Sequence, residues 1–245
     1  MLHTIRWRNA ISAVVLTLMF FIGCISVNPA LAADLPERSE VQSQLATLNK
    51  QKDLTPQDKL VQQDLTQTLE TLDKIERIKS ETTQLRQQVT QAPAKMNQAI
   101  DSLNALSDVP DDEATRKMLS TLSLRQLESR VSQTLDDLQN AQNDLATYNS
   151  QLVSLQTQPE RVQNAMYSAS QQLQQIRNRL NGTSTGEETL RPTQQNLLLA
   201  QQALLNAQID QQRKSLEGNT VLQDTLQKQR DYVTAYSNRL EHQLS

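Results

Sequence analysis

Apolar residues return every seven positions along residues 124–180, in two interleaved series that lie three residues apart. Residues with this spacing share one side of an α-helix, and a repeat kept through several heptads is typical of a coiled coil. Thr134 is the one polar residue among the first ten positions. The predicted coiled-coil seam comprises Leu124, Leu127, Val131, Leu138, Leu145, Tyr148, Leu152, Leu155, Val162, Met166, Leu173, Ile176 and Leu180.

Pro159 lies inside this pattern without changing its phase. Thr157 and Glu160 have the spacing of a capping box, so a new helix can begin here. The pattern is compatible with a kinked continuous helix and with a tight reversal of the chain. We favour the reversal, because a long apolar seam needs a partner and a neighbouring antiparallel helix provides one.

Two helix start signals precede this region. Asp34 and Glu37 have capping-box spacing and are expected to open a short helix. Thr55 followed by Pro56 is typical of an N-cap and a first helical position. The apolar face that follows is interrupted at Pro93, which we expect to break the helix.

Glycines and prolines predict the remaining boundaries. A loop is expected at 107–112, and another at 181–186, where Gly182 is placed to end a helix. A helix from near Pro192 is expected to end at 218–220, and a last helix then continues to Ser245 without a stop signal. We therefore expect the chain to be truncated at its C-terminus.

The fold class predicted by these patterns is all-α, an extended antiparallel coiled coil or helical bundle that follows an N-terminal signal peptide. We divide the chain into a signal peptide at 1–32, N-terminal helices at 33–106, and long heptad-patterned helices at 113–245.

The first residues have the three-part layout of a secretory signal peptide. Arg6 and Arg8 give a positive start, an apolar run covers 10–27, and small residues follow Pro29. The predicted cleavage follows Ala32, with Ala30, Ala32 and Ala33 as the residues of the cleavage site. A retained membrane anchor is an alternative. Another is lipidation of Cys24, because Phe21-Ile22-Gly23-Cys24 is close to a bacterial lipobox.

Cleavage after Ala32 would remove Cys24, the only cysteine, so neither a disulfide nor thiol chemistry would remain. It would also leave 22 basic against 27 acidic residues, a net charge of −5. A protein that binds nucleic acid needs many phosphate-neutralising Lys and Arg residues, so no nucleic-acid partner is expected. Four tyrosines are the only aromatic residues after position 33, which favours thin helix-on-helix seams over a thick core.

The chain offers little catalytic chemistry. His242 is the one histidine outside the predicted signal peptide, so a catalytic triad and a zinc site lack members. We expect no enzyme activity, no cofactor and no metal. The acidic cluster at 108–113 lacks the ligand spacing of a calcium loop and is interpreted as helix capping.

Three stretches carry a resemblance to a known family: 51–65 (QKDLTPQDKLVQQDL), 122–182 and 208–244. They resemble the N-terminal periplasmic region, or MscS porin domain, of the MscK/KefA family of potassium-dependent mechanosensitive channels. That family consists of large relatives of the small-conductance MscS channels.

The resemblance implies a bacterial inner-membrane channel that forms a ring of seven and releases potassium and small solutes under osmotic stress. It also implies that the pore lies far C-terminal of this region, so this chain alone would not conduct. The partners implied are the rest of the channel chain, further copies of it and the inner membrane, with the cell wall as a further candidate. The alternative is a free-standing periplasmic or lipoprotein coiled-coil adaptor or chaperone.

Overall fold

The computed structural model describes residues 35–107, 112–185 and 190–245, which form five helices and no strand. The all-α helical bundle predicted from the sequence is thereby confirmed. The cleavage residues Ala30, Ala32 and Ala33, together with Cys24, lie outside the described residues, so the signal peptide stays a prediction. The helices are α2 (Arg38–Asn49), α3 (Pro56–Ser107), α4 (Asp112–Leu119), α5 (Leu124–Thr185) and α6 (Pro192–Leu244).

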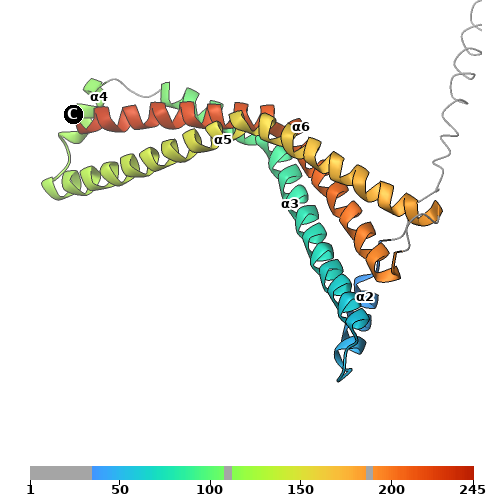
Figure 1. The fold of residues 1–245 in the computed structure, drawn as a ribbon. Helices are drawn as coiled ribbons and strands as arrows, with labels where there is room; N and C mark the ends of the chain where they lie inside the picture. Colours follow the sequence, from blue (N-terminus) through green and yellow to red (C-terminus); the bar gives the residue numbers. More distant parts are fainter. Residues whose placement is uncertain (1–34, 108–111, 186–189) are drawn as a thin grey trace, which may run out of the picture. The chain divides into compact units, whose positions relative to one another are not determined.

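Helix α6 packs against both other long helices (Figure 1). It runs parallel to α3, because Asp64 contacts Arg191 near the start of α6 and Leu106 contacts Arg239 near its end. It runs antiparallel to α5, as expected for a helix that follows α5 through a short connection. The short helix α2 packs on α3.

The core consists of two small apolar clusters on α6. In the first, the fully buried Ala200 packs between Leu72 and Ile75 of α3. In the second, Leu205 packs against Ala169 and Leu173 of α5. The clusters are made of aliphatic side chains, as the scarcity of aromatic residues predicts. Helix α6 therefore supplies two contact faces, one for each neighbour.

One of the two predicted start signals is confirmed. Thr55 and Asp58 form a reciprocal cap at the start of α3: the amide N–H of Thr55 donates to Asp58 Oδ2 over 2.9 Å, and the amide N–H of Asp58 donates to Thr55 Oγ1 over 3.2 Å. The short helix expected from the other signal, Asp34 and Glu37, is present as α2, but the capping box is not its start, and Asp34 lies outside the described residues. Glu37 is itself the N-cap of α2, without a side-chain cap. Leu35 precedes a proline, which disfavours helical backbone there, so α2 begins only after Pro36.

The prolines do not end their helices, which corrects two predictions. Pro93 lies inside α3 and Pro159 inside α5. A proline inside a helix costs about 3 kcal/mol, but buried residues on both sides of each proline keep the helices packed. The partner that the α5 seam needs is α6, so no reversal occurs at Pro159.

The predicted glycine boundaries are also wrong. Helix α5 continues past Gly182 to Thr185, and α6 runs through Gly218 without a break. Glycine in a helix costs only about 1 kcal/mol relative to alanine, so packing can retain it. Helical structure was expected from 113 onward, but its division into the short helix α4 and the long helix α5 was not predicted.

Candidate functional site

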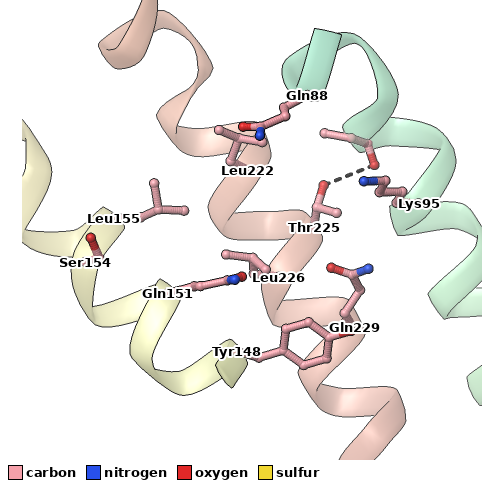
Figure 2. A pocket seen from close by; sticks show the side chains of 11 residues that line it. Gln88, Lys95, Tyr148, Gln151, Ser154, Leu155, Leu222, Thr225, Leu226 and Gln229 are labelled. Carbon is pink, nitrogen blue, oxygen red and sulfur yellow. Dashed lines mark hydrogen bonds between the residues drawn. The ribbon is translucent and has the colours of Figure 1, made fainter. Parts of the chain in front are cut away.

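A cavity of about 460 Å³ lies where α3, α5 and α6 meet. Figure 2 shows Gln88 and Lys95 of α3, Gln151 of α5, and Leu222 and Leu226 of α6 around it. The volume is in the range of small-molecule sites. Its lining offers amide, hydroxyl and ammonium groups but no carboxylate or histidine. The cavity can therefore form hydrogen bonds with a polar molecule.

Two tyrosines lie at the helix interfaces. Burial raises the pKa of the Tyr148 hydroxyl, which borders the cavity, and the negative charge of Asp144 raises it further. Burial also raises the pKa of Tyr236, with additional effects of Asp137 and of Tyr232, whose ring stacks on Tyr236 with 6.0 Å between the centroids. Both hydroxyls therefore stay protonated at neutral pH, a form that can donate a hydrogen bond.

A buried polar cluster joins α5 and α6 beside the cavity. The Asn219 side-chain amide donates to the carbonyl of Leu155 over 2.9 Å and to Gln158 Oε1 over 2.7 Å. Gln223 Nε2 donates to Asn219 Oδ1 over 2.6 Å, and Gln158 Nε2 donates to Ser215 Oγ. Asn219 is only 7% exposed. These directional bonds fix which turn of α5 faces which turn of α6.

A second polar cluster joins the start of α6 to α3. Asp64 Oδ2 accepts from Arg191 Nη2 over 3.0 Å and from Thr193 Oγ1 over 2.9 Å. The Asp64 and Arg191 side chains are 11% and 29% exposed, so this ion pair is largely shielded from water. Arg191 Nε is buried without a hydrogen-bond partner. The cluster anchors the first turn of α6, and Asp64 Oδ2 is occupied by the donors of Arg191 and Thr193.

The structure places the predicted seam residues unevenly. Leu152, Val162 and Leu173 are buried, whereas Leu124 is 73% exposed and Val131 is also exposed. The seam as a functional feature stays a prediction. The half-buried members are Leu127, Leu138, Leu145, Tyr148, Leu155, Met166, Ile176 and Leu180.

Sequence reasoning missed the residues that join the helices. Asp64, Asn219 and Gln158 were not singled out, and Gly218 and Asn219 were interpreted as a helix end. Asn219 lies 64 residues from Leu155, and Arg191 lies 127 residues from Asp64. Local patterns carry no information on contacts of that separation. The one available signal was a Gly-Asn pair inside an otherwise uninterrupted apolar repeat.

In the described part of the chain, no helix has both the length and the apolar content needed to span a membrane. Within the same residues, no group of three or more His, Cys, Asp and Glu side chains could hold a metal ion.

Comparison with known proteins identifies the family. The model of the mechanosensitive ion channel porin domain matches residues 44–245, which is most of the chain. The chain belongs to this family of channel domains. Among curated proteins, the mechanosensitive channel MscK of Escherichia coli strain K12 is 70% identical over 242 residues, which cover 98% of this chain and 22% of that relative. The chain thus spans about a fifth of the relative's length. No solved structure matches.

Proposed function

We propose that this chain is the periplasmic helical domain of a mechanosensitive ion channel, one that releases potassium and small solutes on osmotic shock. The observation that carries the proposal is the family match across residues 44–245. Identity of 70% to a protein named as a mechanosensitive channel supports it. The signal-peptide layout of residues 1–32 supports export to the periplasmic side of the bacterial inner membrane.

In this proposal the domain does not conduct by itself. Its partners are the rest of the channel chain and further copies of that chain, in a ring of seven, with the cell wall as a candidate contact. The described helices suit a mechanical role, because α6 joins α3 and α5 through polar clusters that fix helix register. The domain would hold or sense the periplasmic side of the channel.

The test is a patch-clamp recording of the full-length channel with residues 33–245 deleted, compared with the intact channel at matched expression. We expect a changed tension threshold or a changed dependence on external potassium, with the conductance of a single open channel retained. Unchanged threshold and unchanged potassium dependence would contradict a role of this domain in holding or sensing.

An immunoblot with an antibody against residues 33–245 tests the assembly independently of conduction. After separation of periplasm from inner membrane, we expect a band much larger than 27.7 kDa in the membrane fraction. A soluble periplasmic band slightly below that mass would instead support the free-standing adaptor or chaperone, and the channel function would be withdrawn.

A further inference from the structure

Two long helices of the described chain each contain one proline, Pro93 in α3 and Pro159 in α5. In an α-helix the N–H of each residue donates to the carbonyl four residues earlier. Proline has no N–H, so the carbonyls of Val89 and Leu155 lose their usual donors. Such sites are among the recognised causes of helix kinks.

Two consecutive residues of α6, Gly218 and Asn219, contact the turns that precede these two prolines. On the α5 side, the Asn219 amide donates to the Leu155 carbonyl, the acceptor that Pro159 leaves free. The remaining Asn219 groups are bonded to Gln158 and Gln223. A side chain of α6 thus supplies the hydrogen bond that the α5 backbone lacks.

On the α3 side, Gly218 contacts Val89. A Cβ atom on Gly218 would lie within 3.0 Å of Val89 Cγ2, closer than real Cβ atoms approach, so any other residue would require the Val89 side chain or the spacing of α3 and α6 to shift. Two turns later, Thr225 Oγ1 lies 3.1 Å from the carbonyl of Ala92, directly before Pro93, and 2.7 Å from the carbonyl of Val221, so its single proton is shared between the two acceptors. Helix α6 therefore contacts α3 twice within the turn that leads into Pro93.

The neighbouring geometry agrees with a bend at this level. Figure 1 shows α3 and α6 changing direction together partway along their length. The cavity of Figure 2 lies at the same level, since Gln88, Ala92, Leu155 and Thr225 all line it. Diverging helices leave such space because straight helices would fill it with side chains.

We propose that Gly218 and Asn219 form a junction on α6 that receives the proline turns of both α3 and α5, so that the three helices bend at one level while their register stays fixed. The two halves of the domain then change direction without shearing the apolar clusters. This inference concerns a conformational device and goes beyond the channel function, and its tests measure structure alone.

The first test is a double-mutant cycle in the full-length chain, measured by hydrogen exchange of peptides that cover residues 150–165. Asn219→Ala should accelerate exchange there by about tenfold, the factor for one hydrogen bond of ordinary strength. In a Pro159→Ala background the same change should have a much smaller effect, because the backbone N–H that the substitution introduces supplies the bond to the Leu155 carbonyl. Gln223→Ala, which leaves the Leu155 bond intact, is the matched control and should show no such dependence.

Equal effects of Asn219→Ala in both backgrounds would overturn the proposal, because Asn219 would then act only through its other contacts.

The contact between Gly218 and α3 is tested by thermal unfolding. Gly218→Ala should lower the melting temperature, and adding Val89→Ala, which vacates the space that the new Cβ needs, should restore it. Failure of the second change to restore stability would contradict the Gly218 part of the junction.

A distance measurement tests the bend when variants fold poorly. Spin labels replace the exposed Lys79 and Asn104 of α3 in a Cys24→Ser background. A straight helix would separate positions 25 residues apart by about 37 Å. We expect a shorter mean distance in the parent chain and a longer one after Pro93→Ala. A straight-helix distance that Pro93→Ala leaves unchanged would overturn the proposal.

Discussion

Asp64 and Arg191 form an ion pair that differs from the surface pairs of this chain in its burial. Asp64 Oδ2 also accepts from Thr193, so one carboxylate oxygen serves two donors of α6. The pair of Arg38 with Asp73, by contrast, joins side chains that are 42% and 49% exposed. Exposed pairs contribute little because water and salt screen them, whereas a buried charge that loses its partner is costly.

We therefore predict that Asp64→Ala lowers the free energy of unfolding by about 1–3 kcal/mol, since Arg191 and Thr193 lose their acceptor. Asp73→Ala is the matched control and should change it by less than about 0.5 kcal/mol. Urea unfolding followed by circular dichroism measures both. Equal losses in the two variants would show that the Asp64 pair is no stronger than a surface contact.

The cap of α3 predicts how the stability of the fold depends on pH. Hydrogen bonds from the Thr55 side chain, and then from the Thr55 backbone, lower the pKa of Asp58 below its ordinary value of 3.8. A lowered folded-state pKa means that the ionised form stabilises the fold. This contribution is fully present above pH 3.8 and is lost as the pH falls through the lower folded-state value.

Asp58→Asn should therefore lower the stability of the fold at neutral pH. The variant should also lose less stability than the parent on acidification, because it has no carboxylate at this cap to protonate. Thermal unfolding of parent and variant between about pH 2 and pH 7 measures the difference, which should narrow as the pH falls. A difference that stays constant over the whole range would mean that ionisation of Asp58 does not contribute.

Helix α5 shows how one repeat can have different environments along its length. Leu152, Val162 and Leu173 are buried, whereas Leu124 belongs to the same repeat and is exposed. The repeat specifies which side of the helix is apolar, but burial requires a partner opposite each turn. Within the described residues that partner is α6, which packs against α5 along its buried stretch.

Alanine substitutions along this repeat should differ accordingly. Leu152→Ala is expected to lower the free energy of unfolding by about 2–4 kcal/mol, from lost burial and the remaining cavity. Leu124→Ala should change it by no more than about 0.5 kcal/mol. Urea unfolding of the two variants provides the comparison. A large loss for Leu124→Ala would show that its side is covered in the protein in solution.

At the scale of the whole molecule, α6 connects the described helices into one unit. Residues 35–245 form a single unit, in which both apolar clusters include α6 residues. A substitution that removes contacts between α6 and α5 should therefore also destabilise the packing of α6 against α3. This arrangement also means that a force acting on either outer helix reaches the other through α6.

Leu205→Ala tests this coupling, because Leu205 contacts Ala169 and Leu173 of α5. Hydrogen exchange should accelerate in α5 and in α3, since a loss of about 2–4 kcal/mol in one cooperative unit is shared by all its parts. Leu124→Ala serves as the control. Acceleration confined to α5 and α6 would show that the two sides of α6 open independently.

The fold class was predictable because it rests on local and repeated features, whereas the family was indicated by the resemblance of residues 51–65, 122–182 and 208–244. The heptads of 124–180 specify helices, and the Thr55-Pro56 start specifies the first turn of α3 through contacts three residues apart. The positions of helix ends were less predictable. Pro93, Pro159 and Gly218 are ordinary breakers in isolation, and they stay helical because α6 packs against α3 and α5 on both sides of them.

The sequence by itself determined that this chain forms long amphipathic helices with little catalytic chemistry, since periodicity and composition act over a few residues. The tertiary structure decided the direction in which the helices pair, the burial of Asp64 and the role of Asn219. These features depend on groups 64 to 127 residues apart along the chain. Hydrogen bonds and close contacts of that kind exist only when the folded backbone brings their members together, so no local pattern specifies them.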